Sequence, residues 1–442
     1  MSKLEVAQRG TIIDVTFPEE RVFIRAERLR DRGDSFKAEL VIDADLAMGD
    51  GYRKQRLNRG VTDMLDDYKK NKLVDMLSEM TENSPNILWG NIIRDSFDAI
   101  MDTHREGVPV ETMTGLDVFT PRTYALYPMF VKGVANLMWA PGGSGKSYFA
   151  LLTCIMVDRG MSALNMRAPK GNVLYLDWEE EPDVFRQRLY ALQKGLDVSN
   201  PEESGILYKK MVGSLASNIE SISRTVMDNN ITYVVVDSVG PALGGSGIDQ
   251  EVVEEYFKAL RVLDVTNLSV DHANRAGETT GQWQIHGSAF KYARARQVYE
   301  VRKVQEHESG ELEVVLYHRK ANDSGSRSPR GFRINFEMQE TYNQMEDEYE
   351  RHLETVRFEM LGLGDADREF LRRMNLTQIC FELIKAHGET NIDVLRGNVG
   401  IIKDSEISSD VIKRTIENSK QMKLEGNVVS LRQEETEWNI RS

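Results

Sequence analysis

Residues Val134–Met156 have the sequence VANLMWAPGGSGKSYFALLTCIM, and the architecture predicted for the middle of the chain depends on them. The centre of this stretch, Ala140–Ser147, has the pattern AxxxxGKS and stands between an apolar segment that predicts a strand and another that predicts a buried helix. Glycines let the backbone wrap closely around an anion, and the first N–H groups of a helix attract negative charge. The stretch therefore predicts a phosphate-binding loop made of Gly142, Gly143, Ser144, Gly145, Lys146, Ser147 and Tyr148.

Two side chains of this loop have the chemistry that a nucleoside triphosphate requires. Lys146 can bridge the terminal phosphates, and the hydroxyl of Ser147 can bind Mg²⁺, which neutralises charge during phosphoryl transfer. The alternative is a glycine-rich turn that only links a strand to a helix. The combination of glycines, lysine and hydroxyl disfavours that alternative, so we expect ATP and Mg²⁺ as cofactors.

A second apolar segment, ITYVVVDS at 231–238, brings Asp237 to the end of a predicted strand. After a phosphate loop, such an aspartate is a candidate Mg²⁺ ligand, although many buried strands end in an aspartate that only caps a turn. Ser238 follows it in place of an acid. A catalytic base must therefore come from another strand.

The segment NVLYLDWEEEP at 172–182 offers that base, because an apolar strand ends there in Asp177, Glu179, Glu180 and Glu181. We predict that Glu179 reaches the rim of the sheet beside the phosphates and acts as the general base. Alternatively, these acids only stabilise the N-terminus of the next helix, which fits Glu181 and Asp183 well.

The surrounding segments predict five regions. Residues 1–107 show strand-like alternation to about residue 55 and a helical period from Val61, which indicates an α+β domain. Residues 108–128 contain three prolines and predict a linker, and 129–336 alternate strand and helix patterns, as in a parallel or mixed α/β sheet. Residues 337–369 carry 11 acidic against 3 basic side chains and predict a solvated helix or linker, with a specific acidic surface as the alternative. Residues 370–442 suggest two helices, a turn at Gly426 and a short strand pair, which indicates a winged-helix-like module.

Composition limits the partners and the compartment. The formal charge of the 442 residues is −14, so no global basic field draws the chain to nucleic acid, and any such contact must be local. The C-terminal region is neutral, which leaves a protein-contact or capping role as an equal alternative to DNA binding. Cys154 and Cys380 form no CxxC pair, and the apolar run YFALLTCIMV is shorter than the ~20 residues of a membrane span. We expect a cytoplasmic protein without a membrane segment.

The order of these segments resembles a known family. A phosphate loop, a strand ending in Glu, a strand with a lone Asp and a strand ending in His resemble the RecA-superfamily P-loop ATPases, and specifically the RepA-like hexameric helicases of phages and plasmids. The resemblance covers about 128–335 and includes YLDWEEEP, VDHANR, GSAFKYARARQVYEV and HRKAND. It implies a RecA-like ATPase core, with Glu179 in the position of the catalytic glutamate and Lys146 in the phosphate loop.

The segment VDHANR departs from the pattern of the family, which has two histidines and then a lysine. His272 keeps the second histidine, whereas Asp271 and Arg275 replace the other two residues. The resemblance implies that His272 is a sensor near the γ-phosphate. A purely structural histidine is the alternative.

The resemblance also implies a homo-oligomer, a hexameric ring, in which a neighbour completes each site. Arg296 matches the arginine finger of the family, Arg294 lies one alternate position away, and Lys320 matches a lysine near the same interface. An arginine supplied in trans can raise turnover about 10³- to 10⁵-fold, because it meets charge that develops only in the transition state. Alternatively, the two arginines only solvate the edge of a strand.

Two loops are candidates for contact with single-stranded DNA, namely GGSGID at 244–249 and GETTGQWQIHG at 277–287. Trp283 suits stacking on a base, and Arg275 and Lys291 would attract the backbone. Loops without any DNA contact are the alternative.

Three functions remain open at this point. The favoured hypothesis is an oligomeric ATP-driven motor on single-stranded DNA, a replicative helicase. The second is a DNA-dependent ATPase accessory, such as a helicase loader or a recombinase-like protein, that recruits replication proteins through its terminal domains. The third is a non-catalytic nucleotide switch. Comparing ATP-driven unwinding with DNA-stimulated hydrolysis separates the first two, and turnover that depends on Lys146 would exclude the third.

Overall fold

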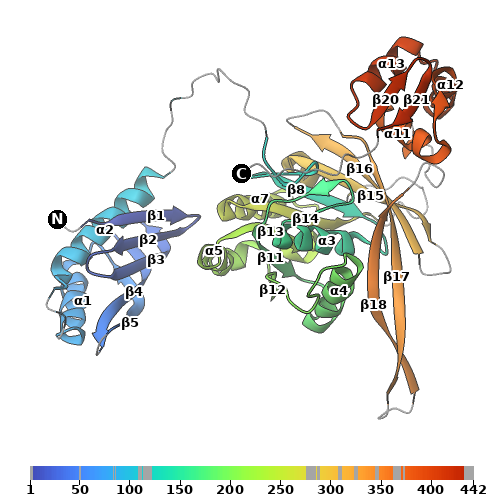
Figure 1. The fold of residues 1–442 in the computed structure, drawn as a ribbon. Helices are drawn as coiled ribbons and strands as arrows, with labels where there is room; N and C mark the ends of the chain where they lie inside the picture. The colour runs from blue at the N-terminus through green and yellow to red at the C-terminus, as the bar shows by residue number, and fades with distance from the viewer. Residues whose placement is uncertain are drawn as a thin grey trace. The chain divides into compact units, whose positions relative to one another are not determined.

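The computed structural model describes residues 3–48, 51–82, 84, 86–107, 112, 122–274, 285, 289–306, 311–322, 327–343, 348–361, 370–371 and 374–432. Figure 1 shows its helices and strands. The chain divides into two compact units. Unit 1 comprises Met1–Thr123, Val212–Thr232 and Pro241–Thr266, and unit 2 comprises Tyr124–Met211, Tyr233–Gly240 and Asn267–Ser442.

Unit 1 contains an antiparallel sheet in the order β1-β2-β3-β4-β5, formed by Glu5–Arg9, Ile12–Phe17, Val22–Asp31, Phe36–Met48 and Gly51–Asp63. One face is apolar because alternate residues of a strand point to the same side, as Val22, Ile24 and Ala26 do in β3. This face packs against α1 (Asp67–Met80) and α2 (Trp89–Glu106) in one buried cluster. Unit 1 also contains η1 (Ala216–Asn218), α5 (Ile219–Asp228) and α7 (Gln250–Leu263).

The region around Val61 differs from the sequence prediction. We predicted a helix from this residue, but Val61 lies in β5, pairs with Glu39 of β4 and is 70% exposed. The helix begins only at Asp67, after Asp66 accepts a hydrogen bond from the backbone N–H of Lys69 as the N-cap. The apolar period around Val61 was misleading, because pairing with β4 satisfies the backbone of the whole segment.

Unit 2 is built on a nine-stranded sheet in the order β12-β11-β13-β14-β8-β15-β16-β17-β18. Its strands are β8 (Ala135–Ala140), β11 (Asn172–Asp177), β12 (Leu207–Lys210), β13 (Ile231–Asp237), β14 (Thr266–His272), β15 (Gln297–Glu306), β16 (Glu311–Ala321), β17 (Arg330–Asn343) and β18 (Glu348–Met360). β12 runs parallel to β11, β14 to β8 and β8 to β15, whereas β15 to β18 pair antiparallel. The predicted α/β architecture with a mixed sheet and a RecA-like core is therefore confirmed.

Several helices and short strands connect this sheet. α3 (Lys146–Arg159) follows β8, α4 (Pro182–Gly195) follows β11, α6 (Val239–Leu243) follows β13, and α9 (Ala289–Arg294) precedes β15. Two small hairpins are formed by β6 (Tyr124–Leu126) with β7 (Phe130–Val131) and by β9 (Ser162–Ala163) with β10 (Met166–Arg167). The end of the predicted linker is thus a strand, while 108–111 and 113–121 lie outside the described residues.

The acidic segment 337–369 also differs from the prediction of a helix or linker. Its described part, 337–343 and 348–361, lies mostly in β17 and β18, which form the long two-stranded ribbon of Figure 1. Val356 and Phe358 are buried, whereas charged residues such as Arg351 and Glu340 pair with each other on the exposed side. In the sequence, the many charged residues made the alternation of buried and exposed side chains difficult to recognise.

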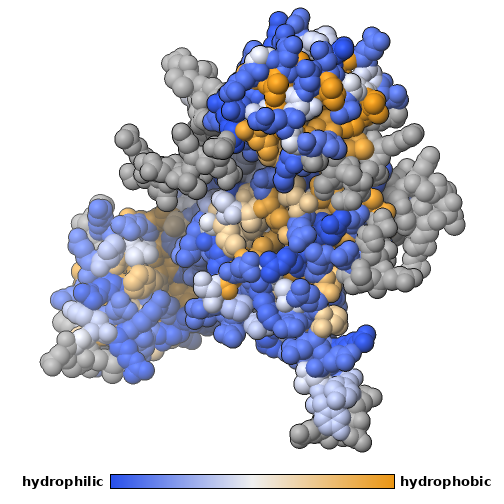
Figure 2. All heavy atoms as spheres, turned by 45° about the vertical axis from the view of Figure 1, so that its right-hand side comes forward, coloured by the Kyte–Doolittle hydropathy of each residue, from blue (hydrophilic) through white to orange (hydrophobic). Residues whose placement is uncertain are grey.

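The C-terminal module begins with α11 (Leu376–His387) and continues with β19 (Thr390–Asn391), α12 (Ile392–Lys403), α13 (Ser409–Glu417), β20 (Met422–Glu425) and β21 (Val428–Leu431). Its small sheet has the order β19-β21-β20, and Gly426 with φ +64° forms the expected turn. Its described part contains three helices where we expected two, which agrees with a winged-helix-like topology. Figure 2 shows apolar side chains among the hydrophilic ones on this module, where Val394 and Ile401 are exposed. Among the described residues, no helix is long and apolar enough to cross a membrane.

Candidate functional site

The phosphate loop connects β8 to α3 as the sequence predicts. Gly143 and Gly145 have φ of +69° and +70°, a conformation that glycine adopts at little cost. A Cβ on Gly145 would lie 2.8 Å from Ile334 Cδ1 of β17, so a larger residue there would also displace the end of that side chain. Gly145 is the N-cap of α3 and offers no side chain to the first N–H groups, which are therefore available to an anion.

Asp237 stands at the end of β13 and is almost fully buried. Tyr175 donates a hydrogen bond of 2.6 Å to its Oδ2, while Oδ1 is buried without a partner among the described residues. Burial raises the pKa of Asp237 to about 6, although hydrogen bonds from Tyr175 and Ser147 lower it. The sequence identified Asp237 and Ser147, but nothing in it pointed to Tyr175, which comes from the neighbouring strand β11.

The arrangement around Asp237 fits a magnesium ion. Asp237 Oδ1 is a buried carboxylate oxygen in need of a partner, and the hydroxyl of Ser147 lies close enough to the same carboxylate to lower its pKa. Mg²⁺ is a hard cation that prefers oxygen ligands and is usually held by one or two protein groups together with phosphate. Ser147 and Asp237 are therefore the residues that would hold it.

Glu179 follows the end of β11 and lies beside the loop. Its Oε1 accepts a hydrogen bond from Ser238 and lies 2.8 Å from Nε2 of His272, and neither contact uses Oε2. The bond from His272 lowers the pKa of Glu179 to about 2, against the opposing effect of burial, and Ser238 and the charge of Lys146 act in the same direction. Glu179 is thus a fixed, charged carboxylate at neutral pH.

The other acids of this segment have structural contacts. Asp177 is buried and accepts hydrogen bonds from the backbone N–H groups of Glu179 and Glu180, which fixes the turn that presents Glu179. Glu180 pairs with Arg188 at 2.7 Å, and Glu181 is the N-cap residue of α4. The side chain of Glu181 forms no capping hydrogen bond to α4 and instead pairs with Lys210, so only its position at the helix N-terminus fits the capping alternative, while Glu179 points to the site.

His272 ends β14, and a buried ion pair lies next to it. Asp271 accepts the backbone N–H of His272 and lies 2.9 Å from Lys291 Nζ, and the side chains of both partners are only 1% exposed. Lys291, which we predicted to attract DNA, is therefore enclosed in the protein and neutralises Asp271. The sequence could not show this pairing, because 20 positions separate the two residues.

A cavity of about 630 Å³ extends from the phosphate loop along β16, β17 and β18. Beyond the loop and Glu179, it is lined by Glu180, Arg188, Glu311, Leu312, Phe336, Met338 and Arg351. Tyr148 and Phe336 meet edge to face, with ring centroids 5.1 Å apart. The sequence prediction placed Met338 and Arg351 outside the ATPase domain, in the acidic segment 337–369, and although Phe336 lay inside the predicted domain, nothing in the sequence marked it as a site residue.

The predicted trans-acting residues gather at the opposite edge of the sheet. The backbone N–H of Arg296 bonds to the carbonyl of Ala135, where β8 begins, whereas the phosphate loop follows the end of β8 at Ala140. Five strand residues of about 3.3 Å each separate the two places by roughly 17 Å. The ammonium of Lys320 donates to three carbonyls at the end of α9, those of Tyr292, Ala293 and Ala295.

This position means that Arg296 cannot reach the phosphate loop of its own chain. Arg294 and Arg296 are both exposed, which fits a contact with a neighbour and solvation of the strand edge equally well. Lys320 instead supports the turn that presents them. Arg275 and Trp283, the two other DNA candidates, lie outside the described residues.

A family model matches the part of the chain that contains the phosphate loop. Residues 105–278, less than half of the chain, match the model of the AAA domain family, and this range contains Lys146, Glu179 and Asp237. A solved structure of a KaiC-like protein from the hyperthermophilic archaeon Pyrococcus horikoshii is similar, with 16% identity and a TM-score of 0.36 over 48% of this chain and 94% of that chain. No curated protein matches the sequence. The family match supports a P-loop ATPase.

Proposed function

We propose that this protein binds ATP with Mg²⁺, hydrolyses it, and works as a homo-oligomeric motor on single-stranded DNA, as its resemblance to the RepA-like hexameric helicases implies. One observation carries the ATPase part of the proposal. Lys146, Asp237 and Glu179 come from three different elements of unit 2 and converge at the phosphate loop.

Each residue of this site has a distinct task in hydrolysis. The loop N–H groups and Lys146 hold the β- and γ-phosphates, and Mg²⁺ supplies charge neutralisation when it is bound by Ser147 and Asp237. Glu179 accepts a hydrogen bond from the attacking water through Oε2, because His272 and Ser238 already occupy Oε1. The low pKa of Glu179 favours orientation of the water over early removal of its proton.

The cavity beside the loop gives the nucleoside a place in the same chain. Tyr148, Phe336 and Leu312 provide apolar and aromatic surface, while Arg188 and Arg351 line the same cavity. A base inserted between these side chains would bury aromatic area, which favours a nucleotide over free polyphosphate. The hairpin of β17 and β18 thus belongs to the nucleotide site in this proposal.

Hydrolysis in the assembled protein requires a second copy. Arg296 lies far from its own loop and is exposed, so a neighbouring protomer is the one that it can serve. A guanidinium placed there would stabilise charge on the γ-phosphate in the transition state. This feature separates a cooperative assembly from a solitary enzyme.

The decisive experiment measures ATP hydrolysis with and without single-stranded DNA, together with the mass in solution in a non-hydrolysable nucleotide and strand unwinding. A motor shows DNA-stimulated turnover, oligomers and unwinding. Stimulated turnover without unwinding would instead support the second candidate, an accessory ATPase. The exposed apolar residues Val394 and Ile401 of the C-terminal module favour that candidate, because exposed apolar side chains are typical of surfaces that bind another protein. Absence of turnover would refute both.

A further inference from the structure

Helix α5 carries a line of alternating charges. Glu220, Arg224 and Asp228 are four residues apart, so they share one face of the helix with the signs minus, plus and minus. This helix belongs by sequence to the ATPase segment, because it lies between β12 and β13, yet it forms part of unit 1.

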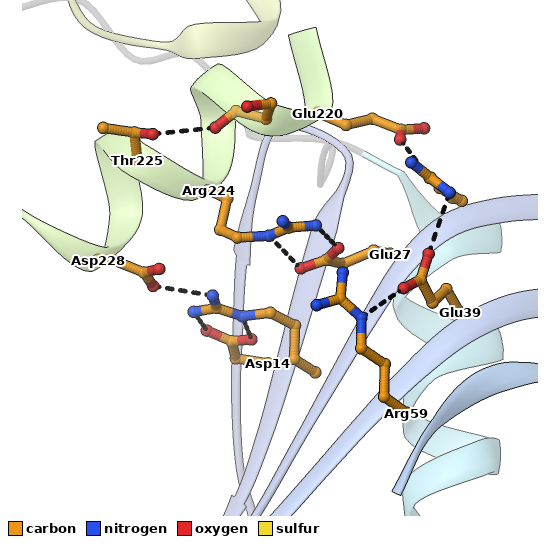
Figure 3. A network of polar contacts seen from close by, with 11 residues as sticks. Asp14, Glu27, Glu39, Arg59, Glu220, Arg224, Thr225 and Asp228 are labelled. Atoms are coloured by element: carbon orange, nitrogen blue, oxygen red, sulfur yellow. Dashed lines mark hydrogen bonds and ion pairs between the residues drawn. The ribbon is translucent and has the colours of Figure 1, made fainter. Parts of the chain in front are cut away.

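Strand β3 of the N-terminal sheet carries the complementary order of charges. Three pairs connect the two elements, and Figure 3 shows them side by side: Arg28 Nε with Glu220 Oε2 at 2.8 Å, Arg224 Nε with Glu27 Oε1 at 2.8 Å, and Arg25 Nη1 with Asp228 Oδ1 at 2.8 Å. Every charge of the line on α5 therefore meets its opposite on one strand.

The spacing of the two elements explains how three pairs form at once. Four residues of an α-helix rise about 6 Å, and two residues of a strand rise about 6.7 Å. Arg25 and Glu27 are two residues apart and match Asp228 and Arg224. Arg28 would point to the other face of a regular strand, but the pairing of β3 with β4 is irregular between Glu27 and Arg30.

The backbone at Arg28 has an unusual conformation that is consistent with a specific contact between β3 and α5. Its φ of +56° is uncommon for a residue with a side chain, and it turns Arg28 toward Glu220 and Glu39. The two arginines also have partners within the sheet itself, since Asp14 binds Arg25 at 2.7 Å and Glu39 binds Arg28 at 3.2 Å.

Burial and close packing distinguish this contact from isolated ion pairs on a protein surface. Glu27 is only 1% exposed, and a carboxylate that is buried without its cation is strongly unfavourable. The turn between β1 and β2 approaches α7 closely as well, because a Cβ on Gly10 would lie 2.6 Å from the carbonyl oxygen of Val262. The N-terminal sheet is therefore fitted to both helices of the ATPase segment.

We propose that the face of β3 formed by Arg25, Glu27 and Arg28 is a docking surface whose partner is α5, and that the alternating charges set its register. Because the outer pairs are partly exposed, salt weakens the docking and the N-terminal domain can be released. Along the chain, α5 leads directly into β13, the strand that ends at Asp237. The docking itself requires no nucleotide.

Amide hydrogen exchange of the full chain, measured on charge-reversal variants of the contact, tests the proposal. Arg224→Glu should speed the exchange of amides in α5 and β3 about tenfold or more, because it places two like charges at Glu27. The double variant Arg224→Glu with Glu27→Arg should restore their protection. Lys258→Glu, the same change of charge at an exposed position of α7, is the matched control and should leave α5 and β3 unchanged.

Protection of α1 reports whether the N-terminal domain stays folded in each variant. Asp228→Arg is a second, more exposed disruption that leaves Glu27 untouched, and it should also release α5 while α1 stays protected. The proposal is wrong if both Arg224→Glu and Asp228→Arg leave α5 and β3 as protected as in the wild type. It is also wrong if the double variant keeps α1 protected but fails to protect α5 and β3.

Discussion

Replacing Lys291 by methionine removes the cation from a buried ion pair. Its Nζ lies 2.9 Å from Asp271 Oδ2, and both side chains are 1% exposed. At an effective dielectric constant of 20, two unit charges at that distance attract by about 6 kcal/mol. Breaking a buried pair by removing one partner typically costs about 3–5 kcal/mol, because the remaining charge stays desolvated. We therefore expect Lys291→Met to lower the stability of unit 2 by about 3–5 kcal/mol.

The loss of stability in Lys291→Met should depend on pH. Burial raises the pKa of Asp271 above its ordinary value, and losing Lys291 raises it further. An acid with a raised pKa in the folded state favours folding when it is protonated, so the variant loses most stability at alkaline pH and recovers as the pH falls toward 4. The double variant Lys291→Met with Asp271→Asn should regain most of the loss at pH 8.

Thermal unfolding and hydrogen exchange of amides in unit 2, both measured between pH 5 and 8, report the stability of the two variants and the wild type. If Lys291→Met were as stable as the wild type at pH 8 and bound single-stranded DNA less tightly, Lys291 would be a DNA contact, and the role assigned to its ion pair would be wrong.

Three further predictions concern the nucleotide site. Glu179→Gln should lower ATP turnover about 10²- to 10⁴-fold and spare ATP binding, as single-turnover and binding measurements will show. Arg296→Ala should lower turnover about 10³-fold in the assembled protein, and mixing it with Lys146→Ala chains, which retain Arg296, should restore part of the turnover; no recovery would contradict a site shared between protomers. Phe336→Ala should weaken the binding of ATP and leave that of tripolyphosphate unchanged, while Tyr342→Ala, farther along the same strand, should change neither.

The sequence was most informative where short-range chemistry decides the structure. The loop from Gly142 to Ser147 and the apolar strand before Asp237 were predictable, because glycine conformation, helix termini and strand burial follow from neighbouring residues. The turn at Glu179 was predictable in outline only. Asp177, rather than a capping contact, fixes that turn through two backbone N–H groups.

The errors came from contacts that are distant in the sequence. The glutamates of 337–369 suggested a solvated helix, but their alternation with Val356 and Phe358 follows from pairing β17 with β18. Lys291 was assigned to DNA because the sequence does not show which residue faces it. Tyr175 and Phe336 lack any local signal, since their contacts with Asp237 and Tyr148 depend on the order of strands in the sheet.

Steady-state ATP hydrolysis by the purified chain with Mg²⁺, compared with that of Lys146→Ala, tests whether the phosphate loop is a catalytic site. We expect turnover in the wild type that requires Mg²⁺ and disappears in the variant, with the fold of unit 2 intact by hydrogen exchange. Equal turnover in both proteins, or none in a wild type that binds Mg²⁺ and ATP, would contradict it.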